Sequence, residues 1–159
     1  MGGEAHAMDI RKAAMCDVER VTALARLLWP DSAPSKLSAL FHELLSSDEA
    51  AVFLCLVADE PAGFAQCQLR HDYVEGTDSS PVGYLEGVYV LEQYRRRSVA
   101  RLLLAACEAW AAGRGCTEFA SDCELQNTDS LRFHLGCGFH EANRIICLTK
   151  RLGTEEKTT

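Results

Sequence analysis

The sequence contains no apolar run approaching the ~20 residues that a membrane-spanning helix requires. Its N-terminus lacks the basic segment and apolar core of a secretory signal, so we expect a cytoplasmic protein with no membrane partner. It also lacks the surplus of Lys and Arg on which nucleic-acid binding depends, since the net charge is −7. An acidic surface instead suits a cationic ligand, although it is equally typical of simple solubility.

Cysteine is abundant, but the spacing that would give it a metal or redox role is missing. None of the eight cysteines belongs to a Cys-x-x-Cys pair, so neither a zinc site nor a thioredoxin-like motif is expected. Most of them lie in apolar stretches, where a free thiol behaves as a small buried hydrophobe. We therefore expect free thiols in a reducing compartment and no bound metal, rather than a disulfide framework.

Internal repeats and low-complexity segments are also absent, and the length of 159 residues suits a single domain. Hydrophobic residues make up 48% of the chain and charged residues 25%, which is ordinary for a soluble globular protein. We interpret residues 1–8 as a leader or an expression remnant, 9–152 as the domain, and 153–159 as a loose polar tail.

Apolar periodicity predicts the element order β-α-α-β-β-β-α-β-α-β, an α+β fold with a mixed sheet. The segment 70–83 is polar and irregular, and its length is typical of a functional loop. Ser35 is the expected cap of the second helix. The expected strands are 9–14, 51–58, 64–69, 88–91, 117–121 and 143–151, and the expected helices are 18–28, 35–45, 99–112 and 127–135.

The segment 84–104 passes from a strand through three consecutive arginines into a helix. The first backbone N–H groups of a helix lack intrahelical partners, and the helix dipole favours negative charge at the same point. Arg95, Arg96 and Arg97 add side-chain donors there. The segment therefore predicts a phosphate or pyrophosphate site, with an amphipathic helix that merely begins with basic residues as the simpler alternative.

Within this segment, Arg95-x-x-Ser98-x-Ala100 resembles the Gln/Arg-x-x-Gly-x-Gly/Ala loop that binds the acyl-CoA pyrophosphate in the GNAT acetyltransferases. Ser98 stands where that family has its central glycine. Glycine lets phosphate approach the backbone without a Cβ in the way, so we expect the loop to survive with weaker CoA binding. The resemblance implies a GNAT-like, mixed and mostly antiparallel central sheet flanked by helices.

A second motif of the family is similar to the segment 127–139, in which an asparagine precedes an aromatic pair and Gly-Phe. His134 replaces the tyrosine that the family uses as general acid toward the departing CoA thiolate. A histidine can donate a proton near neutral pH, and it can equally be a packing or cofactor-contacting residue.

Longer strings resemble bacterial aminoglycoside 6'-N-acetyltransferases, namely Trp29-Pro30, Asp72-Tyr73-Val74-Glu75-Gly76-Thr77, Ser80-Pro81-Val82-Gly83-Tyr84-Leu85-Glu86-Gly87 and Ala120-Ser121-Asp122.

This resemblance covers residues 9–152 and implies acetyl transfer from acetyl-CoA to the 6'-amine of an aminoglycoside, which inactivates the antibiotic. Direct attack in a ternary complex is expected, with a backbone N–H near Val88 stabilising the oxyanion. A polycationic sugar needs carboxylates and an aromatic face. Glu86 is the strongest candidate, because a charge inside an apolar strand is costly without a partner or a task. Glu86, through water, and Asp122 would hold the ammonium group and accept its proton.

The candidate site residues fall into three groups by expected role. Taken alone, each carboxylate is more simply a solvated surface charge, and Trp29 is as easily a core residue as a ligand-facing one. The catalytic candidates are Glu86, Asp122 and His134. The cofactor-binding candidates are Val88, Tyr89, Val90, Arg95, Arg96, Arg97, Ser98, Val99, Ala100 and Asn127. The substrate-binding candidates are Trp29, Asp31, Ser32, Tyr73, Glu86, Asp122, Glu141 and Asn143.

Two alternatives keep part of this interpretation. An acetyltransferase of the same fold acting on a polyamine or a protein amine would also suit an acidic cleft. A CoA-binding sensor without turnover would suit the departures at Ser98 and His134. The resemblance further implies a homodimer, and the apolar segment Ile145–Leu148 is a strand that could pair across its interface.

Overall fold

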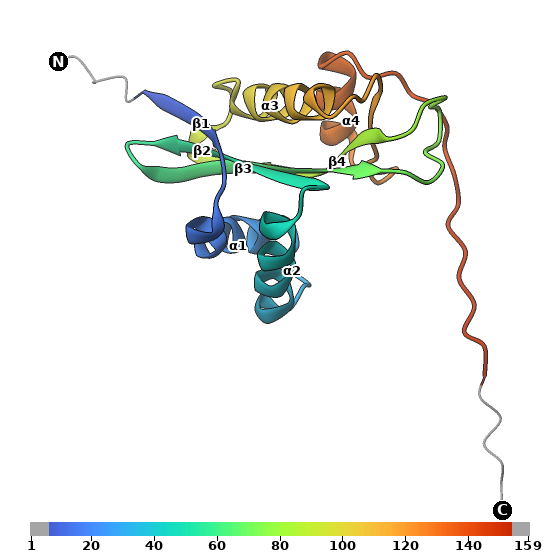
Figure 1. Ribbon diagram of the computed structural model, residues 1–159, viewed down its shortest axis with the longest axis horizontal. Coiled ribbons are helices and arrows are strands. Elements are labelled where there is room, and N and C mark those ends of the chain that lie inside the picture. Colours follow the sequence, from blue (N-terminus) through green and yellow to red (C-terminus); the bar gives the residue numbers. More distant parts are fainter. Residues whose placement is uncertain (1–6, 154–159) are drawn as a thin grey trace, which may run out of the picture.

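Five strands form one sheet in the spatial order β1-β2-β3-β4-β5, in a computed structural model that describes residues 7–153 (Figure 1). The first three strand pairings are antiparallel and β4–β5 is parallel, which confirms the predicted mixed, mostly antiparallel sheet. The strands are β1 (Met8–Lys12), β2 (Ala50–Val57), β3 (Glu60–Arg70), β4 (Val82–Val90) and β5 (Phe119–Ser121). The helices are α1 (Val18–Leu28), α2 (Pro34–Ser46), α3 (Val99–Gly113) and α4 (Thr128–Gly136), with 3₁₀ turns η1 (Met15–Asp17) and η2 (Glu92–Tyr94).

Helices cover both faces of this sheet, and each face has its own hydrophobic cluster. On one face, Leu103 and Cys107 of α3 pack in a cluster that includes Leu85 of β4. On the other, Phe41 of α2 packs edge-on against Phe64 of β3, with α1 alongside (Figure 1). Side chains along β3 and β4 therefore divide between an α3 face and an α1–α2 face, and this division decides where the polar residues lie.

Asp17 is a buried charge that links β1 to the start of α1. Both of its carboxylate oxygens accept hydrogen bonds from the guanidinium of Arg11 at 2.8 Å, and the backbone N–H of Ala14 donates to one of them. The Asp17 side chain is 2% exposed. The hydrogen bonds from Arg11, helped by the one from Ala14, lower the pKa of Asp17 from 3.8 to about 2.

Asp17→Asn is expected to lower the free energy of unfolding by about 2 kcal/mol at neutral pH, because a pKa difference of nearly two units corresponds to that energy. The folded-state pKa is depressed, so the stabilisation is complete above the unfolded pKa of the carboxyl. It is lost as the pH falls through the folded value. Urea unfolding of both proteins at about pH 7 and about pH 2.5 measures the effect. An equal difference at both pH values would contradict the ion-pair explanation.

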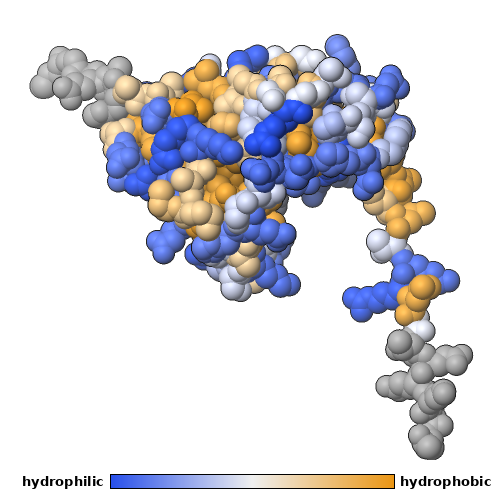
Figure 2. Space-filling view, viewed as in Figure 1, coloured by the Kyte–Doolittle hydropathy of each residue, from blue (hydrophilic) through white to orange (hydrophobic). Residues whose placement is uncertain are grey.

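The prediction of a last strand at residues 143–151 is wrong for a single copy of the chain. Residues 140–153 follow α4 without entering a helix or strand, and Figure 1 shows this segment leaving the body of the molecule. Its apolar residues are exposed, Ile146 and Leu148 each to 87%. Figure 2 shows patches of orange, hydrophobic surface along the segment. An apolar, β-prone sequence becomes a strand only when it pairs with another strand, and this segment pairs with none among the described residues.

Two smaller expectations also change. α2 begins at Pro34, so Ser35 lies inside the helix and is not its cap; proline suits the first helical position because the missing N–H has no partner there anyway. β1 begins at Met8, inside the segment interpreted as a leader, while residues 1–6 and 154–159 lie outside the described part of the chain. No helix within residues 7–153 combines the length and apolar character needed to cross a bilayer.

The cysteines are less buried than expected. All eight are free thiols, but only Cys55, Cys67 and Cys107 are buried, whereas Cys16 and Cys147 are exposed. The prediction that most of them are buried is therefore wrong. Apolar neighbours in sequence did not ensure burial: the segment touches the loop 71–81 through Ala142 and Asn143, whereas Cys147 beyond them is exposed.

Candidate active site

β4 and β5 lie side by side only over their first residues. The parallel register joins Gly83, Tyr84 and Leu85 to Phe119–Ser121, and β5 then ends. From Glu86 onward, β4 has a strand neighbour on its β3 side alone among the described residues. Backbone N–H and C=O groups along such an edge are available to an extended ligand, which can add to the sheet as a further strand.

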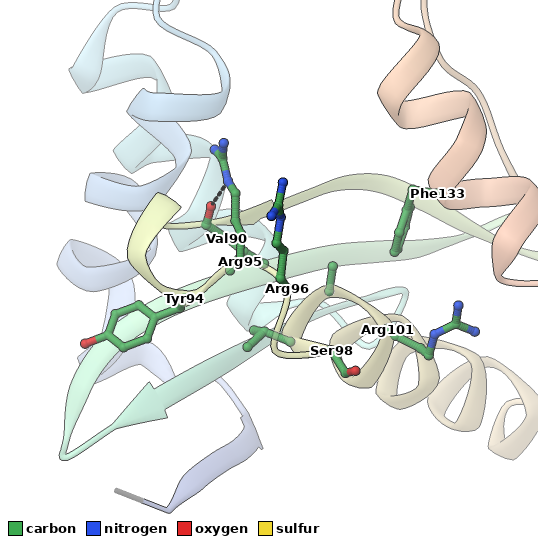
Figure 3. Close-up of a pocket in the computed structure, with 9 residues that line it drawn as sticks. Val90, Tyr94, Arg95, Arg96, Ser98, Arg101 and Phe133 are labelled. Atoms are coloured by element: carbon green, nitrogen blue, oxygen red, sulfur yellow. Dashed lines mark hydrogen bonds between the residues drawn. The ribbon is translucent and has the colours of Figure 1, made fainter. Parts of the chain in front are cut away.

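The loop after β4 forms a cavity of about 250 Å³ at the N-terminus of α3. In Figure 3 the side chains of Arg95 and Arg96 stand side by side on this loop, and Phe133 of α4 lies across from them. Helical N–H groups and guanidinium groups together favour phosphate. The lining residues are Val90, Tyr94, Arg95, Arg96, Ser98, Val99, Ala100, Arg101 and Phe133.

The structure brings only part of the predicted cofactor set to this cavity. Its lining includes the predicted Val90, Arg95, Arg96, Ser98, Val99 and Ala100, but not Val88, Tyr89, Arg97 or Asn127. Arg97 lies near the ring of Tyr94, 5.9 Å from its centroid, and does not line the cavity. Arg101 does line it, and sequence reasoning missed it although its place in the first turn of the predicted helix was a usable signal. Arg95 is also a structural residue, since its Nε donates to the carbonyl oxygen of Val90 at 3.0 Å.

The loop backbone is held in a conformation that glycine adopts most easily. Arg96 and Ser98 have φ angles of 60° and 61°, both in the left-handed region. For a residue with a Cβ this conformation costs on the order of 1 kcal/mol. Ser98 therefore adopts a left-handed backbone conformation that a glycine would adopt without that cost.

Glu86 sits in a β-bulge of β4. Gln66 is opposite Gly87 and Cys67 is opposite Leu85, which leaves Glu86 as the extra residue. Because Leu85 and Val88 both pack on the α3 face, the bulge puts Glu86 and Gly87 together on the α1–α2 face. There Glu86 Oε1 accepts hydrogen bonds from Arg70 Nε at 3.1 Å and Nη2 at 2.8 Å.

Asp122 joins the same group of side chains through Tyr84. Its Oδ2 accepts a hydrogen bond from the Tyr84 hydroxyl, and the guanidinium carbon of Arg70 lies 3.4 Å from the centroid of the Tyr84 ring. Burial, helped by the hydrogen bond to Asp122, raises the pKa of Tyr84, so its hydroxyl stays protonated near neutral pH. We call Arg70, Tyr84, Glu86 and Asp122 the acidic cluster. Sequence reasoning missed Arg70 and Tyr84, because only the strand register reveals that they adjoin the carboxylates.

Trp29 borders this cluster from the end of α1. A Cβ built on Gly87 would lie 2.7 Å from the Trp29 ring, so the ring packs directly on the backbone beside Glu86. The ring also meets Phe64 edge-on, which makes Trp29 part of the core as well as a wall of the site. Asp31 and Ser32 are exposed in the connection to α2, and within the described residues no hydrogen bond or ion pair joins them to the acidic cluster.

The outer substrate candidates form a separate group. The Tyr73 hydroxyl and the Asn143 amide both donate to Glu75 at 3.2 Å, where the loop 71–81 meets the segment after α4. Glu141 pairs with Arg144, which lowers the pKa of its carboxyl. Within residues 7–153 no hydrogen bond or ion pair connects this group to the acidic cluster, so the structure does not unite all the predicted carboxylates in one site.

Glu118 fixes the loop that carries Tyr73. Its Oε1 accepts hydrogen bonds from the backbone N–H groups of Asp78 and Ser79 and from the Ser79 hydroxyl. These bonds, the one from the Ser79 hydroxyl foremost, lower the pKa of Glu118. The long loop is therefore anchored to the residue just before β5 rather than left loose.

His134 is buried on α4 with both ring nitrogens engaged. Nδ1 is 2.7 Å from the carbonyl oxygen of Ser130, and Nε2 is 2.9 Å from the hydroxyl oxygen of Ser121 on β5. A carbonyl only accepts, so in the neutral ring Nδ1 carries the proton and Nε2 accepts from Ser121. This geometry favours the interpretation of His134 as a packing residue over its role as general acid. The side chain of Asn127 also has a structural partner, because its oxygen caps α4 by accepting a hydrogen bond from the backbone N–H of Ser130.

Comparison with known proteins identifies the relatives of this chain. Residues 18–139 match the model of the acetyltransferase (GNAT) family. The chain is 46% identical to an aminoglycoside N(6')-acetyltransferase type 1 of Stenotrophomonas maltophilia, over 89% of this chain and 92% of that protein. It is 41% identical to the protein of the same name from Salmonella enteritidis, over 91% and 99% respectively. The fold is similar to that of AAC(6')-Iy solved with the bisubstrate analogue CoA-S-monomethyl-acetylneamine, with a TM-score of 0.89 and 40% identity over 92% of this chain and 99% of that one.

Proposed function

This chain belongs to the GNAT acetyltransferase family, and from that membership we propose that it transfers the acetyl group of acetyl-CoA to the 6'-amino group of aminoglycosides and so inactivates them. The observation that carries the proposal is a continuous path along β4. Its uncovered edge leads from the arginine-lined cavity to the acidic cluster. That path has an anion site at one end and carboxylates for a cationic amine at the other.

The proposed cofactor site uses both parts of this path. Acetyl-CoA supplies a thioester that an amine can attack. The pantetheine arm would pair with the β4 backbone beyond Glu86, as an added strand does. The pyrophosphate would bind the guanidinium groups of Arg95, Arg96 and Arg101 and the backbone N–H groups at the start of α3.

The proposed chemistry is direct attack of the 6'-amine on the thioester. An ammonium group must lose a proton before it can attack, and Glu86, through water, with Asp122 would accept it. A backbone N–H near Val88 would stabilise the oxyanion. The carbonyl then re-forms as the CoA thiolate leaves. His134, with both nitrogens bound to serines, would hold α4 against β5 rather than protonate the thiolate.

Release of the CoA thiol tests the proposal. Acetyl-CoA is mixed with neomycin or with paromomycin, two aminoglycosides that differ in having an amine or a hydroxyl at the 6' position. We expect turnover with neomycin and none with paromomycin. Turnover with spermidine or a lysine peptide in place of neomycin would favour another amine acceptor. Binding of acetyl-CoA without thiol release from any amine would favour a sensor.

We also propose that the protein is a homodimer in which the segment 140–153 packs against a second copy. Support comes from the exposed Ile145, Ile146, Leu148 and Leu152 on that segment, which no part of the described chain covers. Large apolar side chains gathered in this way on one exposed segment are typical of an interface. β5 is an edge strand three residues long, and a strand from a partner would extend it.

Ile146→Asp is expected to convert the dimer into a monomer, because a charge replaces an apolar side chain at the centre of that interface. Light scattering after size exclusion measures the mass of each protein. Leu27→Asp is the matched control, since it alters an exposed leucine on α1, away from the segment. A parent protein that is already monomeric, or a variant that stays dimeric, would overturn the proposed arrangement.

The proposed location is the cytoplasm, without nucleic-acid or membrane partners. The eight free thiols suit a reducing compartment. The net charge of −7 disfavours phosphate backbones and anionic lipid surfaces alike.

A further inference from the structure

Arg70 is the one cation of the acidic cluster, and nothing so far assigns it a role in the reaction. It is the last residue of β3 and lies beside Glu86 and Tyr84 of β4. Nε and Nη2 both donate to the same carboxylate oxygen, Oε1 of Glu86. Within the described residues, Oε2 of Glu86 accepts no hydrogen bond.

This geometry differs from that of an ion pair that serves stability alone. A guanidinium usually binds a carboxylate with two parallel hydrogen bonds, one to each oxygen, which uses both acceptors. Here the Glu86 side chain is 21% exposed and Arg70 37%, so a second group can still reach Glu86. Ion pairs this exposed contribute little to folding, whereas holding a reacting carboxylate in one orientation affects rate strongly.

The contact of Arg70 with Tyr84 extends its influence to the second carboxylate. Its guanidinium covers the Tyr84 ring, and the Tyr84 hydroxyl donates to Asp122. The charged and titratable groups of the cluster are thus Arg70 on β3, Tyr84 and Glu86 on β4, and Asp122 after β5. With Tyr84 neutral, Arg70 leaves the cluster with one net negative charge instead of two.

We propose that Arg70 is a positioning residue for acetyl transfer. It holds Glu86 by Oε1, so that Oε2 faces the 6'-ammonium group. It also fixes the Tyr84 ring, and through the Tyr84 hydroxyl it fixes Asp122. This inference rests on the proposed function and deepens it. Arg70 takes no proton and touches no substrate atom. It acts through the two carboxylates, and its charge limits how strongly they attract the cation.

Arg70→Ala is expected to lower kcat for neomycin at least about 10-fold, because a catalytic group released from its geometry loses that much or more. KM for neomycin should stay level or fall, since the cluster now carries an extra negative charge. A residue with only a structural role would lower both substrate binding and thermal stability instead. Arg70→Lys, which keeps the charge but not the fork of donors, should lie between the parent and Arg70→Ala.

The decisive comparison places Arg70→Ala in a Glu86→Gln background. If Arg70 acts through Glu86, the second substitution should reduce kcat by less than about threefold, because residues that act as a unit are not additive. Full multiplication of the two single effects would overturn the proposal. Methylguanidinium added to Arg70→Ala should restore part of kcat, and sodium chloride at equal ionic strength should not.

Arg114→Ala is the matched control. Arg114 also lies over an aromatic ring, that of Trp110, and donates to a backbone oxygen, that of Asp48, but at the far end of α3. It should affect melting temperature and leave kcat unchanged. If Arg70→Ala does not fold, Arg70→Gln takes its place in the same kinetic comparison with Glu86→Gln. A parent without thiol release would overturn the proposed function, whereas an active parent with an equally active Arg70→Ala would overturn only the role of Arg70.

Discussion

Glu86→Gln is expected to reduce kcat for a 6'-amino aminoglycoside by about 100-fold, because a general base of this kind contributes on the order of 10²- to 10⁴-fold. The amide keeps the size of the side chain and can still accept from Arg70 through its oxygen. It cannot take the proton of an ammonium group. The loss should therefore fall on the chemical step, with KM for acetyl-CoA unchanged.

Initial rates of thiol release at saturating acetyl-CoA measure this effect. Glu43→Gln makes the same change on the exposed face of α2, where we expect parental rates. The dependence of KM on the charge of the aminoglycoside is a second measurement, because loss of a carboxylate should also raise the KM for a polycation. If kcat of Glu86→Gln equals that of the parent, proton acceptance at this position is ruled out and Asp122 becomes the next candidate.

Arg96→Glu is the second substitution with a large expected effect. It changes the arginine-lined cavity after β4, where we propose that CoA binds. We expect CoA to bind about 100-fold more weakly, because a charge-assisted hydrogen bond to phosphate is lost and a like charge takes its place. Arg96 is a better choice than Arg95, whose bond to the Val90 carbonyl also supports the loop. Its side chain lines the cavity and, among the described residues, makes no hydrogen bond to β4.

Calorimetric titration with CoA measures the affinity. Lys36→Glu is the control, because it changes the net charge equally on the exposed surface of α2. The difference between parent and Arg96→Glu should shrink as salt is raised, since the interaction is electrostatic. Equal losses in Arg96→Glu and Lys36→Glu would mean that overall charge, and not the cavity, governs binding.

The sequence could predict the fold because most of its signals are local. Helical spacing in Val18, Val21 and Leu24 and the apolar run of β2 each describe one element without its neighbours. The arginine-rich turn could be found for the same reason, since the residues of the loop and the first turn of α3 are adjacent in the chain.

Features that depend on pairing between distant segments could not be predicted in this way. Arg70 and Glu86 meet only because of the β3–β4 register and its bulge. The segment 143–151 has a strand-like sequence but pairs with no strand among residues 7–153, which periodicity does not report. Similarly, Ser121 lies on β5 and His134 on α4, so a spacing motif could not show that Nε2 of His134 is engaged.

The bulge at Glu86 constrains how this site can change over evolution. On one side of it Tyr84 and Glu86 must face α1 and α2, and on the other side Gly87 and Tyr89 must face the same way. Removing or adding a single residue in β4 would turn one of these pairs toward α3, because side chains alternate along a strand. Gly87 is similarly fixed by the Trp29 ring. Insertions and deletions that alter drug preference should therefore accumulate in residues 29–33 and 71–81, while β4 keeps its length.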